Sequence, residues 1–217
     1  LQSLDCIFFF FFILFRKFVL GEGIVMVKLI DIHTHNPQPG VLSPTMAGIH
    51  PWDAERRLPM PKFDECDIIG ETGIDYASEV DKESQKELFR AHLDIAEKLG
   101  KPVVLHSVKS FEPTMQMLRK YNLKGVVFHS FIGSIEQAER AIKRGYYLSF
   151  GHRSLRSPRT QQLIASIPIE NLFCETDDQT EMSIDKIYNE VAALRGISTE
   201  ELAANIDKNY RRLFDIR

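Results

Sequence analysis

The sequence of 217 residues has little of several features that define common protein classes. Its three cysteines, Cys6, Cys66 and Cys174, fit neither a disulfide framework nor a zinc-binding CxxC pattern. We therefore expect free thiols in a reducing compartment, the cytoplasm. An excess of positive charge is also missing, because the formal net charge is −3. A protein that binds nucleic acid only through its backbone charge would be basic, so any nucleic-acid binding is expected to rest on a local site.

An apolar run long enough to cross a bilayer is missing too. The Phe-rich run at residues 7–15 is shorter than the about 20 residues of a spanning helix, and Arg16 and Lys17 follow it. Met26 opens a segment that leads into a candidate strand. We therefore expect residues 1–25 to be an extension outside the fold and residues 26–217 to form a single domain. A membrane-associating tail is the alternative for the Phe-rich run, although no membrane partner is expected for the domain.

After residue 25 the sequence alternates between short apolar runs and amphipathic segments. Continuous apolar runs are typical of strands that are buried on both faces of a parallel sheet. The expected strands are residues 28–33, 46–50, 67–71, 102–106, 125–129, 146–150 and 171–175. Capping boxes and closing glycines indicate helices at residues 81–99, 134–144, 157–167, 184–195 and 198–213. This strand–helix repetition predicts a parallel α/β sheet with right-handed crossovers.

Side chains that can bind metal lie at the C-terminal ends of these strands. His33 and His35 are two residues apart on an extended segment, so both point to the same side. Later strand ends carry His50, Glu71, His106, His129 and Asp177. A doubly wound sheet collects ligand groups at one switch point, whereas nearly every strand of a barrel contributes to one face. The pattern therefore predicts a (β/α)8 TIM barrel.

Taken alone, each of these side chains is as easily explained by packing, capping or ion pairing. Their joint position at strand ends favours a metal site. Four imidazoles and two carboxylates suit Zn²⁺, Mn²⁺ or a similar ion, and they exceed the needs of one tetrahedral site. With a bridging carboxylate they can serve two ions about 3.5–4 Å apart, which activate water for hydrolysis. The expected ligands are His33, His35, Glu71, His106, His129 and Asp177.

A series of motifs along residues 27–215 resembles the TatD family of metal-dependent deoxyribonucleases, a group of amidohydrolase-like TIM barrels. The motifs are DIHTH (31–35), GIHPW (48–52), IGETGIDY (69–76), PVVLH (102–106), FHSFIG (128–133), ETD (175–177) and NYRRLF (209–214). The resemblance implies phosphodiester hydrolysis that removes nucleotides from the 3′ ends of DNA, single-stranded DNA included, with Mg²⁺, Mn²⁺ or Zn²⁺. We expect a monomer.

The resemblance also implies roles for individual residues. His33, His35 and Asp177 would hold one metal ion, and His106 and His129 would hold the second. Glu71 would bridge the two ions, and Asp177 would also orient or deprotonate the attacking water. These two carboxylates are the expected catalytic residues. His50 matches a position near the substrate phosphate, so we expect it to bind substrate.

The chain departs from the family pattern around the expected cleft. Residues 36–49 are too few for the βα unit that usually follows the first strand, which predicts a barrel shortened near strand 2. Val108 stands where the family often has arginine, and Lys109 follows it. Lys109, His152 and Arg153 are further candidates for substrate contacts, because arginine binds phosphate bidentately, although solvated surface charge explains them equally well. Trp52 and Phe131 are candidates for base stacking or for ordinary packing.

Two other functions fit the ligand plan. A metal-dependent amidohydrolase or lactonase that acts on a small molecule would use a similar site, often with a modified lysine between the metals. No lysine occupies a matching strand end, whereas Glu71 does, which favours the nuclease-type plan. A non-enzymatic remnant is disfavoured, because burying an intact set of polar ligands costs stability unless metal or partners satisfy them.

Overall fold

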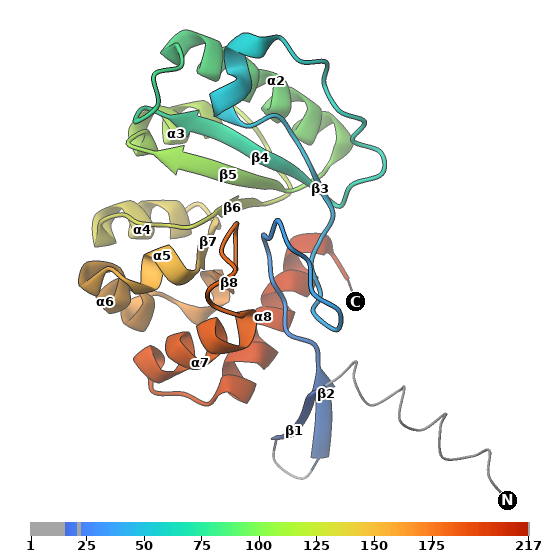
Figure 1. Ribbon diagram of the computed structural model, residues 1–217, viewed down its shortest axis with the longest axis vertical. Coiled ribbons are helices and arrows are strands. Elements are labelled where there is room, and N and C mark those ends of the chain that lie inside the picture. Colours follow the sequence, from blue (N-terminus) through green and yellow to red (C-terminus); the bar gives the residue numbers. More distant parts are fainter. Residues whose placement is uncertain (1–15, 21–22, 217) are drawn as a thin grey trace, which may run out of the picture.

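The computed structural model describes residues 16–20 and 23–216. Its core is a six-stranded parallel sheet in which each strand pairs with the next one in chain order. Figure 1 shows the strands stacked in this order with helices on their outer side. The strands are β3 (Met46–Ala47), β4 (Ile68–Asp75), β5 (Val103–Val108), β6 (Val126–Phe128), β7 (Tyr147–Phe150) and β8 (Leu172–Cys174). This sequential parallel order is that of a (β/α)8 barrel.

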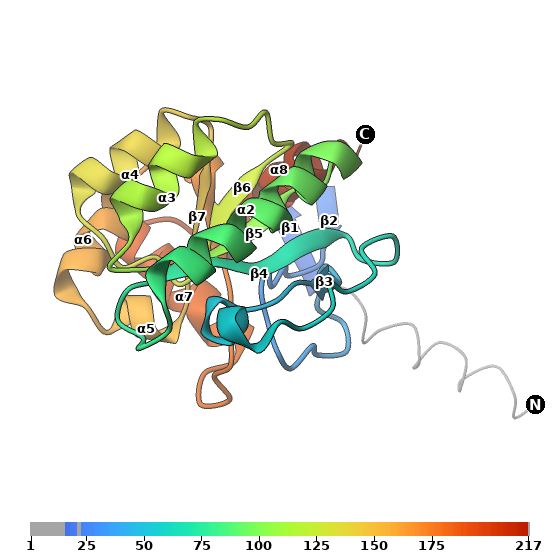
Figure 2. The ribbon, with the colours of Figure 1, turned by 90° about the horizontal axis from the view of Figure 1, so that it is seen from above.

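Helices connect successive strands and cover the barrel wall from outside, as the view from above shows (Figure 2). The helices are α2 (Lys82–Leu99), α3 (Phe111–Leu118), α4 (Ile135–Ile142), α5 (His152–Leu155), α6 (Pro158–Ser166), α7 (Ile184–Arg195) and α8 (Thr199–Phe214), with short 3-10 turns η1 (Pro51–Arg56) and η2 (Ile169–Asn171). The five predicted helices are all present. Ser134 and Gln137 form the expected capping box, and Gly196 closes α7 with a left-handed φ of 66°. The short elements α3, α5 and η1 were not predicted, because their apolar pattern spans too few turns.

The predicted strand at residues 28–33 is wrong as a strand, because the structure has only isolated parallel bridges there. Ile30 bridges Leu42, and Thr34 bridges Asp177. The amide of Ile32 also donates to the carbonyl of Cys174, 3.1 Å away. The first segment thus closes the barrel between β8 and Leu42. The short connection that follows leaves no room for a crossover helix, so a single residue is all that remains of a paired second strand.

Side chains from later elements hold residues 28–50, which we call the N-terminal segment. Tyr188 of α7 is fully buried, and its hydroxyl donates to the carbonyl of Ile30 at 2.8 Å and accepts from its amide at 3.1 Å. His92 of α2 accepts a hydrogen bond from the amide of Ile49 at 3.0 Å. These side-chain contacts therefore add to the scattered backbone hydrogen bonds of the segment, whereas the regular strands have continuous backbone ladders.

The regular strands run from β4 to β8, and we call them the β4–β8 arc. The structure corrects their predicted bounds. β4 continues to Asp75 and β5 to Val108, whereas the strand expected at residues 46–50 is reduced to Met46–Ala47. Gly73 explains part of the extension, since a Cβ there would lie 2.1 Å from the carbonyl oxygen of His106 and its φ is +139°. Only glycine lets β4 and β5 approach so closely at this point.

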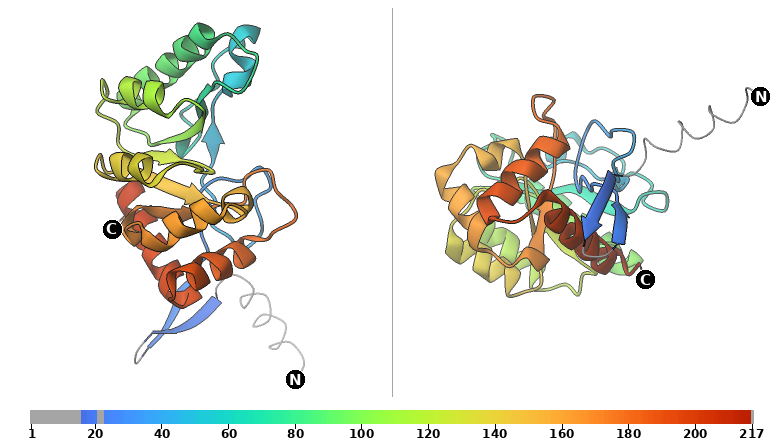
Figure 3. Two further views of the ribbon diagram at one scale, coloured as in Figure 1. Left: turned by 90° about the vertical axis from the view of Figure 1, so that its left-hand side faces the viewer. Right: turned by 90° about the horizontal axis from the view of Figure 1, so that it is seen from below.

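An antiparallel hairpin of β1 (Arg16–Leu20) and β2 (Gly23–Val27) precedes the barrel and lies beside α8 (Figure 3). The hairpin crosses the domain start expected at Met26, so the assignment of residues 1–25 to an extension stays a prediction. Residues 1–15, which include the whole Phe-rich run, lie outside the described residues. Among the helices of residues 16–20 and 23–216, none combines the length and apolar character needed to cross a bilayer.

Candidate metal centre

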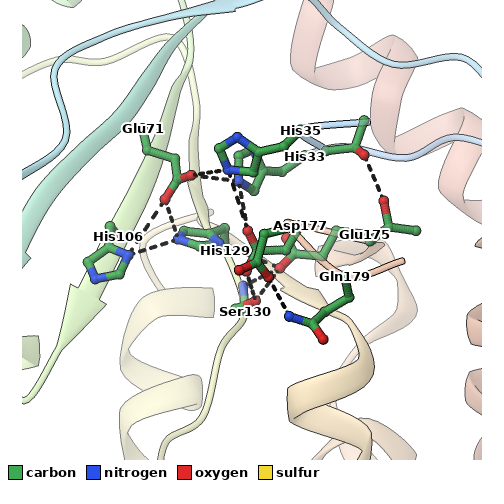
Figure 4. Close-up of polar contacts among 12 residues, drawn as sticks. His33, His35, Glu71, His106, His129, Ser130, Glu175, Asp177 and Gln179 are labelled. Atoms are coloured by element: carbon green, nitrogen blue, oxygen red, sulfur yellow. Dashed lines mark hydrogen bonds and ion pairs between the residues drawn. The ribbon is translucent and has the colours of Figure 1, made fainter. Parts of the chain in front are cut away.

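The predicted ligands meet in one pocket of about 1230 Å³ at the C-terminal ends of the strands. Figure 4 shows Glu71 between two groups of imidazoles. Its Oε1 atom lies 2.9 Å from Nε2 of His33 and 3.0 Å from Nε2 of His35. Its Oε2 atom lies 3.0 Å from Nε2 of His129 and 3.6 Å from Nδ1 of His106. The two oxygens of one carboxylate thus face ligand groups on opposite sides.

The pairing of the N-terminal segment with the end of β8 sets the first side of the cluster. The amide of Asp177 donates to the carbonyl of His33, and the amide of His35 donates to the carbonyl of Asp177, each at 3.0 Å. The side chains then converge, with Oδ1 of Asp177 lying 3.4 Å from Nε2 of His33 and 3.7 Å from Nε2 of His35. A parallel bridge between residues more than a hundred positions apart therefore brings three expected ligands together.

On the second side, the imidazole of His106 is fixed by a carboxylate that the sequence analysis did not single out. Asp75 is buried at the end of β4, and its Oδ2 lies 3.1 Å from Nε2 of His106. The same oxygen accepts a hydrogen bond from the indole nitrogen of Trp52 at 2.7 Å. Nδ1 of His106 is thereby directed toward Glu71 and His129. Carboxylates that hold a ligand imidazole in this way fix its orientation and tautomer.

His129 has a similar partner in Glu175, which follows β8 and is fully buried. Nδ1 of His129 lies 3.5 Å from Oε1 of Glu175, and that oxygen accepts hydrogen bonds from the amide and hydroxyl of Ser130 at 2.7 and 2.6 Å. The hydroxyl of Ser149 donates to the other oxygen of Glu175. The same hydroxyl lies 3.3 Å from Oδ2 of Asp177. One buried carboxylate thus orients His129 and, through Ser130, Asp177.

The period-two alternation of a strand contained a signal for Asp75. Positions 71, 73 and 75 lie on one face of an extended strand, so a strand continued past Glu71 would have placed Asp75 beside it. The early end assigned to this strand hid the relation. Glu175 had no comparable signal, because a buried carboxylate near a strand end looks the same in sequence whether it touches metal or a ligand imidazole.

The charges in the cluster are strongly coupled. Burial disfavours a charged imidazole, but the carboxylates of Asp177 and Glu71 outweigh it and raise the pKa of His33 to about 9. Burial also disfavours the charged form of His129, but the carboxylates of Glu175 and Glu71 outweigh it and raise the pKa of His129 to about 10. Burial would raise the pKa of Glu71, yet the surrounding imidazoles hold it well below its usual range. The carboxylate is therefore ionised and ready to bind cations.

The donor set fits divalent metal ions. The two ring nitrogens of His33 and Nδ1 of His129 are buried without a hydrogen-bond partner of proper geometry. Nε2 of His33 lies 2.9 Å from Oε1 of Glu71 and 3.4 Å from Oδ1 of Asp177, so an ion between these groups would satisfy it. Buried polar atoms without partners are costly, so a bound ion would remove this cost. Three groups of residues could each hold an ion, because within each group the ligand atoms lie within 4.8 Å of one another. The groups are His33, His35, Glu71 and Asp177; His50, Glu71 and His106; and His129, Glu175 and Asp177.

The expected substrate contacts are distributed unevenly. His50 lies inside the cluster, with Nε2 3.6 Å from Oε2 of Glu71, and burial, then the charge of His106, lowers its pKa to about 4. Lys109 and Arg153 line the pocket. Arg153 lies 3.1 and 3.2 Å from the two carboxylate oxygens of Asp178. His152 is not among the residues that line the pocket, and its role in substrate binding stays a prediction.

Solved structures share this fold. The YjjV protein of Escherichia coli, a TatD homologue, superposes with a TM-score of 0.73 at 22% identity over 88% of this chain and 99% of that one. A TatD family hydrolase of Entamoeba histolytica gives a TM-score of 0.69 at 19% identity over 81% of this chain and 76% of that one. The predicted TIM barrel is therefore confirmed, including its shortening at strand 2, which the Leu42 bridge makes visible.

Sequence comparisons agree with the fold. A TATDN1 homologue of Encephalitozoon cuniculi is 35% identical over 60% of this chain and 50% of that protein. YabD of Bacillus subtilis, described as an uncharacterized metal-dependent hydrolase, is 30% identical over 68% of this chain and 65% of that protein. The chain thus spans about half to two thirds of the length of the curated relatives that it matches. The sequence model of the TatD related DNase family matches residues 31–215, and this chain belongs to that family.

Proposed function

We propose that this chain is a metal-dependent phosphodiesterase that hydrolyses DNA, with two divalent ions, Mg²⁺, Mn²⁺ or Zn²⁺, held by the residues around Glu71. The position of Glu71 carries the proposal. Its two oxygens face separate sets of imidazoles, as a carboxylate shared by two ions would. Paired ions in such a site supply a nucleophilic water and neutralise charge on a phosphoryl oxygen. Family membership and the name of human TATDN3, a deoxyribonuclease 27% identical over 67% of this chain, support DNA as substrate.

Asp177 is the residue we assign to proton transfer. Burial would raise its pKa, but His33 outweighs this and the pKa is lowered, so the carboxylate is ionised near neutral pH. Its left-handed φ of 56° and the hydroxyl of Ser130 at 3.3 Å fix its side chain toward the cluster. An ionised, fixed carboxylate can orient an attacking water and accept its proton.

The pocket rim supplies the basic groups for the DNA strand. Among the described residues that line the pocket, the lysines and arginines are Lys109 and Arg153. A phosphate would compete with Asp178 for the guanidinium of Arg153, whose Nη2 atom contacts both oxygens of that carboxylate. His50 is neutral at physiological pH because its pKa is lowered to about 4, so it would act as a hydrogen-bonding group toward substrate and not as a cation.

The direction of digestion follows from the same experiment that tests the activity. Single-stranded DNA labelled at its 5′ end would be incubated with the full chain and Mg²⁺ or Mn²⁺, with EDTA as the metal-free control. We expect a ladder that shortens from the 3′ end, is abolished by EDTA and is lost in Asp177→Asn. Asp64→Asn makes the same chemical change at an exposed site outside the pocket lining and should cleave normally.

Cleavage that survives EDTA or Asp177→Asn would contradict the proposal. Bound metal without any DNA cleavage would favour the small-molecule hydrolase instead. A protein that binds no divalent metal would exclude both functions.

A further inference from the structure

Trp52 exposes a large aromatic surface inside the pocket. It lies in η1, two residues after the N-cap His50, and 58% of its surface is accessible. Its ring meets the imidazole of His50 edge-on, with the ring centres 4.5 Å apart. Leu58 and Ile132, both exposed, line the same pocket. Apolar surface exposed to water is unfavourable, and a group of exposed apolar side chains is typical of a binding site. Their position beside a charged cluster indicates a ligand with an apolar face.

The indole is held in a fixed orientation. Its nitrogen donates to Oδ2 of buried Asp75 at 2.7 Å, the oxygen that also contacts His106. The other oxygen of Asp75 accepts from the amide of Ala77 at 2.8 Å. The polar edge of Trp52 is therefore satisfied within the protein, while its ring stays accessible. A tryptophan that served only to pack the rim would bury its rings, and this one leaves them open.

We propose that Trp52 is a stacking platform for a nucleobase of the bound strand, next to the metal cluster. The inference rests on the proposed DNA hydrolysis and adds a base-binding subsite to it. Lys109 and Arg153 in the same pocket provide positive charge for the phosphates. Aromatic rings beside basic groups are the usual means by which proteins hold single strands without reading their sequence. The shared contact with Asp75 makes this carboxylate a positioning residue for both Trp52 and His106.

The chain itself provides the probe, because Trp52 is its single tryptophan. The full-length Asp177→Asn variant, which should not cleave, would be titrated in Mg²⁺ with a dye-labelled thymidine oligonucleotide. A matched oligonucleotide with abasic sites keeps the phosphates and lacks the bases. Dye anisotropy reports binding, and tryptophan fluorescence reports stacking on Trp52.

We expect the thymidine strand to quench Trp52 with the same midpoint as the anisotropy change. The abasic strand should bind about 5- to 100-fold more weakly and leave the fluorescence unchanged. By anisotropy, Trp52→Leu should bind the two strands almost equally, whereas Trp52→Phe, which keeps an aromatic face, should retain part of the preference. Circular dichroism would verify that both variants remain folded.

The outcomes separate the two proposals. If both strands bind equally to the protein that retains Trp52, or if Trp52→Leu keeps the full preference for bases, the platform is wrong and DNA hydrolysis is unaffected. If neither strand binds, the proposed DNA substrate fails and the platform fails with it.

Discussion

The N-terminal segment and the β4–β8 arc contribute to the same site but are built differently. The arc consists of parallel strands with helical crossovers. Its ladder positions His106, Glu71 lies at a register shift between β4 and β5, and His129 directly follows β6. The N-terminal segment has isolated bridges and the two-residue strand β3, and side chains of α2 and α7 hold its backbone. A barrel can thus lose most of one βα unit and still deliver its first pair of histidines, provided that later side chains supply the missing hydrogen bonds.

The largest expected effect comes from the residue that joins the two regions. Glu71→Gln would replace the carboxylate that faces His33 on one side and His129 on the other. Loss of a residue that only contacts a metal ligand can lower metal affinity by about 100-fold. We expect at least that fall for Glu71→Gln, with a matching loss of nuclease activity. Calorimetric metal titration would measure it. Glu190→Gln, on the exposed surface of α7, is the matched control, and normal metal binding by Glu71→Gln would disprove the bridging role.

The next effect would come from removing the α7 contact of the N-terminal segment. Tyr188→Phe leaves the buried amide and carbonyl of Ile30 without their hydroxyl partner. We expect the free energy of unfolding to fall by about 1–3 kcal/mol, as measured by urea denaturation. Tyr147→Phe on β7 loses one contact, with Arg212, and should cost less. Equal losses in the two variants would mean that the two regions do not differ in this way.

A smaller, pH-dependent effect is expected at His92. Burial lowers its pKa below the 6.5 of an unfolded histidine, although its bond to Leu88 opposes this. Above pH 6.5 the residue is neutral in both states, and below it the unfolded chain binds the proton first, so stability falls as the pH drops. His92→Gln should remove up to about 1.4 kcal/mol per pH unit of this slope below pH 6.5. Unfolding curves of both proteins, compared pH by pH, would detect it, and parallel slopes would contradict it.

The smallest effect should come from an exposed contact at the end of the N-terminal segment. The hydroxyl of Thr45 donates to Asp67 at 2.7 Å and accepts from its amide at 3.0 Å. Because both residues are exposed, water replaces these bonds readily. Thr45→Val should lower the free energy of unfolding by about 0.5–1.5 kcal/mol, measured beside the exposed loop variant Thr180→Val. A loss larger than that of Tyr188→Phe would reverse the ranking of the contacts.

The sequence predicted most where backbone regularity carries the fold. Apolar runs and caps identified the strands and five helices of the arc, because periodicity and capping are local properties. The closing of the barrel was not predictable, since the contact of Tyr188 with Ile30 joins residues that no local pattern relates. The six expected ligands converge, yet the carboxylates behind them, Asp75 and Glu175, were missed as partners. Their role depends on which atoms face the imidazoles, and residue type alone does not contain that information.

The bridge between Thr34 and Asp177 has a consequence for the order of assembly during synthesis. The first histidines leave the ribosome early, but their partner carboxylate and the α7 tyrosine that holds Ile30 are made near the end of the chain. While the arc forms, the histidine pair therefore has Glu71 available but still lacks Asp177. A truncated nascent chain would have the strands that carry His106 and His129 and still lack a complete metal site.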